Sequence, residues 1–325
     1  MNNTSTNTVY VKKESSGWKW FFGIVLVLIF IGLLMVAGSF LIFSSAVTNM
    51  DTGDYYYETT GGSGSERIAV VDLDFTIISS ESIVRQFKKY AKDDRVKAII
   101  LRINSPGGGV AASQEMYEII RRTRDGGKPV IVSMGSIAAS GGYYSACGSS
   151  YIFANPGTLT GSIGVIINLM SFKELAEKIG IKETTIKSGE LKDAGNPFKV
   201  LTEKDSLYFQ DIINNSFQQF FDVVATERHI DRERLKEIAN GRVFTGSQAL
   251  ELGLVDKLGT FDDAVKYAAD LVGIEGDPPL VRERRRKGFF TYVIEGLTHS
   301  EFDDIKQEVK EEYIDAPLLQ YKFVK

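Results

Sequence analysis

Cysteine and histidine are scarce in this sequence of 325 residues. Cys147 is the only cysteine, and His229 and His299 are the only histidines. One cysteine excludes an intrachain disulfide, and without a C-x-x-C pair or a His/Cys cluster a zinc site of a familiar kind has too few ligands. We therefore expect no metal and no cofactor. Cys147 lies among small residues and is expected to be a buried structural thiol.

An excess of charge of either sign is also lacking. The formal net charge is −4, with 25% of the residues charged and 43% hydrophobic. This balance gives no overall basic field, so no nucleic-acid partner is expected. The basic cluster RERRRK at 282–287 is typical of a solvated charge run, and a contact with a membrane surface is the alternative.

One long apolar run lies near the amino terminus. Residues 21–43 carry no charge, and as a helix they would be about 35 Å long, enough to span a hydrocarbon core of about 30 Å. The run is longer than the apolar region of a cleavable signal peptide, so a retained transmembrane anchor is predicted, with cleavage near residues 44–46 as the alternative. Lysines precede the run and acidic residues follow it. This bias predicts a single-pass cell-membrane protein with residues 1–20 in the cytoplasm and the remainder outside.

Beyond the run, the pattern is that of an α/β domain. Apolar, β-branched stretches at 68–73, 98–103 and 130–134 are typical of buried strands, and a helical pattern at 115–124 separates the last two. This alternation predicts parallel βαβ units. A longer helix is predicted at 203–227, and its aromatic face suits either the core or a subunit contact.

These features divide the chain into five predicted segments. They are a cytoplasmic tail (1–20), a transmembrane anchor (21–43), a flexible linker rich in Tyr, Gly and Ser (44–66), a catalytic domain (67–274) and a charged tail (275–325). A short amphipathic helix is predicted at 261–271, near the end of the catalytic domain.

Two glycine-rich segments follow predicted strands and could carry chemistry. NSPGGG at 104–109 can approach a ligand without side chains and direct amide N–H groups at a developing oxyanion. An ordinary strand-to-helix turn is the alternative, and the phosphate-loop pattern is missing. GSIAASGGYY at 135–144 places Ser140 between small residues, with the Gly141 N–H available to an oxyanion. Ser136 is an alternative nucleophile, and close helix packing is the alternative to catalysis.

A nucleophilic serine needs a base, and the sequence offers lysine more readily than histidine. His229 falls near the end of the predicted long helix and His299 in the charged tail, so a Ser-His-Asp triad has little support. The segment IKSGELKD at 186–193 offers Lys187 and Lys192. A lysine base must be neutral near pH 7, which requires its surroundings to lower the pKa by about three units from about 10.4.

Taken together, these motifs resemble a known family. They are NSPGGG at 104–109, MGSIAASGGYY at 134–144, TLTGSIGV at 158–165, KSG at 187–189 followed by Lys192 and Asp193, GRVFTG at 241–246 and GLVD at 253–256. In this order they resemble the signal peptide peptidase A family, serine protease family S49, of the short single-repeat type. The resemblance covers residues 67–270 and the apolar run.

The resemblance implies roles for individual residues. By position, Ser140 is the nucleophile, Lys192 the general base, Ser162 a residue that holds the lysine by a hydrogen bond, and Gly107 a contributor of its amide to the oxyanion hole. Lys187 is left as structural. The family also implies a ClpP/crotonase-like α/β fold and a ring-shaped homo-oligomer on the membrane surface. Neighbouring subunits of such a ring could each supply one residue of the dyad. The implied substrates are signal peptides left in the membrane after preprotein processing, with misfolded secreted proteins as further candidates.

Two other functions fit parts of the pattern. A crotonase-like acyl-CoA enzyme shares the glycine-rich loop, but the domain is predicted to lie outside the membrane, where CoA esters are scarce. A non-catalytic membrane scaffold would keep the peptidase fold, but every expected type of catalytic residue is present. A membrane-anchored serine endopeptidase with a Ser/Lys dyad is therefore the predicted function.

Overall fold

The computed structural model describes residues 17–50, 55–285 and 320–322, which fall into two units. The first contains helix α1 (Gly17–Met50), whose described side chains within residues 20–36 are mostly apolar and exposed. No helix in the described part of the chain is both long and apolar enough to cross a membrane, so the predicted anchor at 21–43 is not shown.

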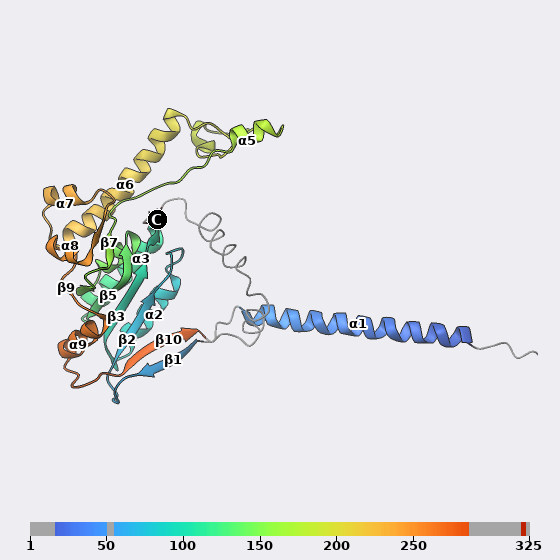
Figure 1. Ribbon diagram of the computed structural model, residues 1–325, viewed down its shortest axis with the longest axis horizontal. Helices are drawn as coiled ribbons and strands as arrows, with labels where there is room; N and C mark the ends of the chain where they lie inside the picture. Colours follow the sequence, from blue (N-terminus) through green and yellow to red (C-terminus); the bar gives the residue numbers. More distant parts are fainter. Residues whose placement is uncertain (1–16, 51–54, 286–319, 323–325) are drawn as a thin grey trace, which may run out of the picture. The chain divides into compact units, whose positions relative to one another are not determined.

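The second unit is built on a mostly parallel sheet. Among the described residues it has nine strands in the order β1-β10-β2-β3-β5-β6-β9, with β7 beside β5 and β8 beside β7 (Figure 1). The strands are β1 (Tyr55–Thr60), β2 (Arg67–Leu73), β3 (Val96–Ser105), β5 (Val130–Ala139), β6 (Tyr151–Ala154), β7 (Leu159–Gly161), β8 (Val243–Thr245), β9 (Lys257–Leu258) and β10 (Leu280–Arg285). Strands β2, β3 and β5 contain the three predicted stretches and pair in parallel, which confirms the predicted α/β class.

Helices cover both faces of this sheet. The helices described in this unit are α2 (Glu81–Lys92), α3 (Val110–Asp125), α4 (Gly141–Ala146), α5 (Lys173–Lys178), α6 (Glu203–Glu227), α7 (Arg232–Ile238), α8 (Gly246–Glu251) and α9 (Phe261–Val272), and the 3-10 turn η1 (Glu190–Asp193) follows α5 in the chain. Because side chains alternate along a strand, Val71 joins the apolar cluster formed with α2, α3, α4 and α6, whereas Val70 joins the cluster formed with α9. The predicted helices at 115–124, 203–227 and 261–271 are confirmed as α3, α6 and α9.

The sheet extends beyond both predicted ends of the catalytic domain. The predicted linker contains β1, and the predicted tail contains β10, which pairs in parallel with β2. Tyrosine and threonine favour strands, and in β1 this preference prevails beside the Gly/Ser stretch that follows. Residues 55–60 of the predicted linker and residues 280–285 of the predicted tail are thus strands of the sheet.

The basic cluster at 282–287 is also corrected in part. Within β10 the Glu283 side chain is buried, and it accepts hydrogen bonds from Arg85 and from the Tyr57 hydroxyl. Arg284 forms an ion pair with Glu58 at 3.0 Å. The cluster is thus a strand up to Arg285, with paired charges from Arg282 to Arg284 instead of a solvated run, and residues 286 and 287 lie outside the described residues.

Helix α6 links the core to a segment that we call the arm, residues 166–201, which carries α5 and η1 (Figure 1). The carboxyl-terminal half of α6 buries Phe220 and Val224 in the core, whereas its amino-terminal half packs against the arm. The arm exposes many large apolar side chains, namely Met170, Phe172, Leu175, Ile179, Ile181, Ile186, Phe198, Val200 and Leu201.

Candidate active site

Ser140 lies at the junction between β5 and α4. Its side chain is 1% exposed, and its Oγ has no hydrogen-bond partner among the described residues. Its backbone has φ 53° and ψ −116°, a strained conformation for a residue with a Cβ. A buried hydroxyl without a partner, on a strained strand-to-helix turn, is the geometry in which a serine nucleophile is presented, even though the G-x-S-x-G pattern is absent.

Neighbouring segments hold this strained turn in place. The Ser140 N–H donates to the Gly161 carbonyl at 2.8 Å, and the Tyr144 N–H donates to the Ser140 carbonyl at 2.8 Å. A Cβ added at Gly142 would lie 3.1 Å from the Ser105 carbonyl oxygen, so α4 packs closely on the end of β3. The small residues around Ser140 therefore serve both close packing and presentation of the hydroxyl.

The structure brings Ser162 beside Ser140. Ala139 pairs with Gly161 across the parallel strands β5 and β7, so the next residue of each strand is one of these two serines. Adjacent strands lie about 4.8 Å apart. Ser162 is buried, has φ 50°, and donates its N–H to the Arg242 carbonyl at 2.9 Å. Its position suits a residue that orients another group toward Ser140.

The glycine loop forms strand β4 (Gly107–Gly109), which also contacts α4. Gly107 has φ 98°, and a Cβ added at Gly108 would lie 2.1 Å from the Ile77 carbonyl oxygen, so the loop requires glycine. The Gly107 N–H donates to the Ser105 Oγ at 3.2 Å. The structure thus places Gly107 at the same end of the sheet as Ser140, with its amide occupied by a neighbouring hydroxyl.

Lys192 does not lie near Ser140 within one chain. It is exposed in η1, and its Nζ has no hydrogen bond or ion pair among the described residues. The arm around it is tied to the start of α6 by Lys199, which contacts Asp205 at 2.9 Å. Asp205 is about 22 Å along the helix from Phe220, whose ring contacts Tyr144 beside the serine.

The other candidates have different surroundings. Lys187 forms an ion pair with Asp193 at 2.6 Å, and Ser136 is exposed on β5. His229 is exposed just beyond the end of α6, whereas His299 lies outside the described residues. Within the described ranges no three His, Cys, Asp or Glu side chains are grouped to hold a metal ion.

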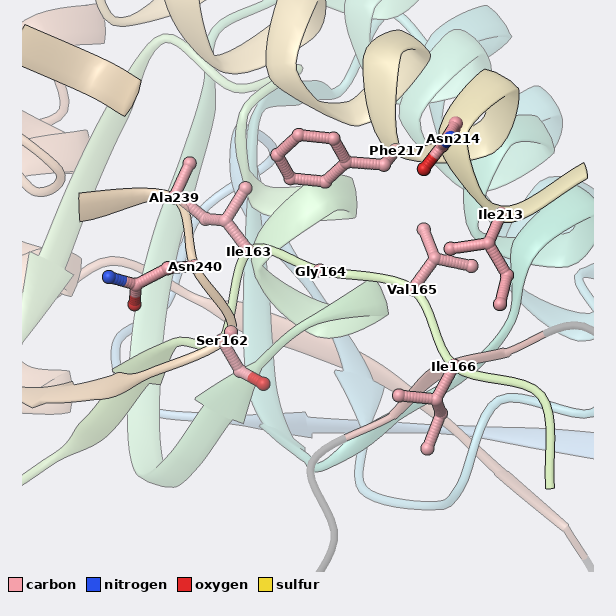
Figure 2. A pocket seen from close by; sticks show the side chains of 11 residues that line it. Ser162, Ile163, Gly164, Val165, Ile166, Ile213, Asn214, Phe217, Ala239 and Asn240 are labelled. Carbon is pink, nitrogen blue, oxygen red and sulfur yellow. The ribbon is translucent and has the colours of Figure 1, made fainter. Parts of the chain in front are cut away.

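An open pocket of about 500 Å³ adjoins Ser162. In Figure 2, Phe217 and Ile213 from α6 face Ile163 and Val165 across it. Sequence reasoning missed this pocket because its walls come from three separate segments. The available signals were the apolar residues after Ser162 and the apolar face of α6. The pocket can accept an apolar side chain of a ligand bound beside the two serines.

Sequence reasoning also missed two polar contacts near α4, which are buried or partly buried. The Tyr143 hydroxyl donates to the Leu254 carbonyl at 2.9 Å, and Arg228 pairs with Asp256 at 2.6 Å. Burial raises the pKa of the Cys147 thiol to about 12, so it stays neutral and is structural, as predicted. The hydrogen bond from Tyr143 ties α4 to the core and so helps to hold the turn at Ser140.

A mostly parallel sheet, with a glycine loop beyond β3 and a strained serine beyond β5, defines a ClpP-like α/β protein. In agreement, the Clp protease family model matches residues 53–158, and the model of peptidase family S49 matches residues 122–275.

Individual proteins give the same result. The chain is 42% identical over 213 residues to "Putative protease slr0021" of Synechocystis sp., covering 65% of this chain and 76% of the relative. It is 34% identical over 295 residues to "Putative protease MJ0651" of Methanocaldococcus jannaschii, covering 85% and 89%. It is 40% identical over 185 residues to "Putative signal peptide peptidase SppA" of Enterococcus faecium, covering 57% and 54%. The chain belongs to peptidase family S49.

Proposed function

We propose that the protein is a serine endopeptidase in which Ser140 is the nucleophile and Lys192 the general base. The observation that carries this proposal is the buried Ser140 hydroxyl, which has no hydrogen-bond partner in the described structure. The backbone of Ser140 is also strained. In the proposed reaction, neutral Lys192 takes the proton as Ser140 Oγ attacks the peptide carbonyl. The protonated lysine then gives that proton to the leaving amine, and water hydrolyses the acyl-enzyme.

The remaining site residues have supporting roles in this proposal. Ser162, beside Ser140, holds the lysine by a hydrogen bond. The Gly107 amide stabilises the oxyanion once it exchanges its present acceptor, Ser105 Oγ, for the substrate oxygen. Both roles use groups that already lie at the nucleophile's end of the sheet.

The dyad is proposed to form between two copies of the chain. Lys192 is exposed on an arm tied to the far end of α6, so one chain by itself leaves Ser140 without a base. The large apolar side chains of the arm give it a surface that a second copy can cover. Burial in such an interface would also supply the dehydration that a lysine base requires. A ring of identical subunits repeats the contact at every site.

Signal peptides in a membrane are the proposed substrates, and a transmembrane segment at 21–43 is the proposed anchor. The anchor is supported by the uncharged sequence and by the exposed apolar side chains of α1. The substrate class is supported by the similarity to the protein printed as a signal peptide peptidase and by the apolar pocket beside Ser162. The preceding lysines support a catalytic unit outside the cytoplasm.

Cleavage of a synthetic signal peptide by the purified full chain tests the reaction. Mass spectrometry should show fragments with the wild type and none with Ser140→Ala. The exposed Ser136→Ala is the matched control and should retain cleavage. A serine-directed phosphonate should label wild type and Ser136→Ala but not Ser140→Ala. Cleavage by Ser140→Ala would remove this residue from the mechanism.

Protease added to intact cells tests the anchor. The Gly/Ser stretch at 61–65 should be cut from outside, because the proposed topology exposes it there. Protection in whole cells, with cutting only after lysis, would reverse the proposed orientation.

A further inference from the structure

A carboxylate lies directly after the proposed base, in the 3-10 turn η1. The Asp193 side chain is 11% exposed, and its Oδ1 accepts hydrogen bonds from Lys187 Nζ at 2.6 Å and from Lys199 Nζ at 3.2 Å. The hydrogen bond from Lys187, together with that from Lys199, lowers the pKa of Asp193. The carboxylate is therefore ionised at about pH 7 and keeps both partners.

The geometry of η1 relates the direction of this carboxylate to that of the base. A 3-10 helix has three residues per turn, so successive side chains point about 120° apart. Because Asp193 points toward its two lysine partners, the side chain of Lys192 is directed to another side of the turn, where it is exposed. The Lys192 N–H donates to the Gly189 carbonyl at 3.1 Å and keeps the turn closed.

Lys199 connects the turn to helix α6. Its Nζ also contacts Asp205 at 2.9 Å. Asp205 is 2% exposed and forms the capping box with Thr202 that begins α6. The bridge from Asp193 through Lys199 to Asp205 thus fastens the turn that carries the base to a buried group of the first helical turn.

Two other contacts of η1 are less able to fix it. The ion pair between Lys204 and Glu190 also joins the turn to α6, but its side chains are 59% and 68% exposed, and such pairs contribute little. The pair between Lys187 and Asp193 joins residues of the same short segment, so it does not hold that segment to the helix. The bridge through Lys199 is therefore the main support of the turn among the described residues.

We propose that Asp193 is a positioning residue for the general base, and that its bridge through Lys199 to α6 directs Lys192 outward, where a second copy of the chain can use it. This inference rests on the proposed peptidase function. A base must come within about 2.6–3.2 Å of the proton that it takes, and a displacement of about 1 Å can cost about a hundredfold in rate. A loosened turn changes how often Lys192 reaches Ser140, not how a peptide binds. Loss of Asp193 therefore lowers kcat and leaves KM nearly unchanged.

Steady-state kinetics of the full chain test this role. Asp193→Ala should lower kcat about tenfold, with KM within about twofold of the wild type. Asp193→Glu keeps the carboxylate and should recover most of the loss. Glu190→Gln is the matched control, because it breaks the exposed pair with Lys204 in the same turn and should keep the wild-type kcat. A wild-type kcat in Asp193→Ala, in a protein that Lys192→Ala inactivates, overturns the inference and leaves the proposed function intact.

A double-mutant cycle tests whether Asp193 acts through Lys192. The rate at which a serine-directed phosphonate labels Ser140 measures the reactivity of the hydroxyl even where turnover is too slow to follow. Asp193→Ala should slow labelling about tenfold in the wild-type background and have no effect in Lys192→Ala, because the base that it positions is then absent. Equal slowing in both backgrounds overturns the inference, since Asp193 would then act by another route.

Hydrogen exchange measures the turn without relying on catalysis. The Lys192 N–H should exchange faster in Asp193→Ala than in the wild type, and at the wild-type rate in Glu190→Gln. Equal exchange in Asp193→Ala and the wild type overturns the inference. Faster exchange in Asp193→Ala, in a protein that Lys192→Ala leaves fully active, would uphold the bridge but refute Lys192 as the base, and with it the positioning role.

Discussion

Ser140 and Lys192, the two residues of the proposed dyad, lie in contrasting surroundings. Every residue from 138 to 149 is buried, and the turn at Ser140 is held by hydrogen bonds to β7 and α4. Lys192 is exposed on an arm fastened by charge pairs such as Lys199 with Asp193 and Asp205. The Lys199 side chain is 27% exposed in both pairs, so solvent partly screens them and weakens their contribution. One chain thus preorganises the proposed nucleophile, whereas the proposed base would depend on a contact that fixes the arm.

The largest expected effect is the loss of peptidase activity when Lys192 is replaced. Lys192→Ala should lower kcat/KM about a hundred- to ten-thousandfold, the usual contribution of a general base. Lys192→Arg should be nearly as damaging, because a guanidinium stays protonated. Steady-state assays with a fluorogenic peptide measure both. Lys187→Ala, which removes the neighbouring ion-paired lysine, is the control and should keep most of the activity. Substantial turnover by Lys192→Arg would assign the base elsewhere.

Mixing of inactive variants tests whether the Ser140 and the Lys192 of one active site come from different copies of the chain. Ser140→Ala and Lys192→Ala proteins should each be inert alone. After subunit exchange in a cyclic ring, about one quarter of the interfaces should pair an intact serine with an intact lysine, restoring up to about that share of activity. Native mass spectrometry confirms the exchange. Full exchange without recovered cleavage would show that each chain completes its own dyad.

Because the part of the site around Ser140 is rigid, we expect a substitution in its glycine loop to lower both activity and stability. Gly108→Ala places a Cβ 2.1 Å from the Ile77 carbonyl oxygen and should reduce kcat/KM at least about tenfold, with stability lowered by about 2 kcal/mol. Gly127→Ala is the matched control, because its φ is also positive but nothing lies within 4 Å. It should lower stability by about 1 kcal/mol and leave catalysis intact. Denaturant unfolding and peptide assays compare the two variants.

The smallest expected effect concerns the ion pair that holds the arm to α6 and its dependence on pH. The hydrogen bond from Lys199 lowers the pKa of Asp205 to about 2. An unfolded Asp titrates near about 3.9, so this stabilisation is complete above that pH and is lost as the pH falls toward about 2. Pepsin should therefore cut residues 186–201 faster at pH 2 than at pH 4.

A substitution separates this effect from general acid unfolding. Asp205→Asn should already show faster cutting of the arm at pH 4, because it removes the charge that holds Lys199. Asp125→Asn, which breaks a surface pair with Arg121 on α3, should not. Identical cutting patterns for both variants would contradict a role of Asp205 in holding the arm.

The parts of the fold that the sequence predicts are those with local periodicity. Strands β2, β3 and β5 and helices α3, α6 and α9 each have a regular apolar pattern, and all were found. Strands β1 and β10 were missed because their signals are aromatic or charged, and because their place depends on pairing between distant parts of the chain.

In the candidate site, too, the sequence predicts the local motif but not the contacts between distant segments. The motif around Ser140 indicates a nucleophile, but the neighbourhood of Ser162 depends on the pairing of Ala139 with Gly161, which no local pattern reveals. The pocket combines side chains of the 163–166 segment, α6 and the loop at 239–241. The separation of Lys192 from Ser140 follows from the direction of α6, which sequence spacing does not give.

The strained backbone at Ser140 bears on which residue would be most stable at this position. Glycine adopts positive φ at no steric cost, whereas serine at φ 53° and ψ −116° carries a strain of about 1–3 kcal/mol. Drift toward stability would therefore favour glycine here, but a chain with glycine would have no hydroxyl at the end of β5. Serine at this position therefore provides a hydroxyl at the end of β5 at a cost in stability.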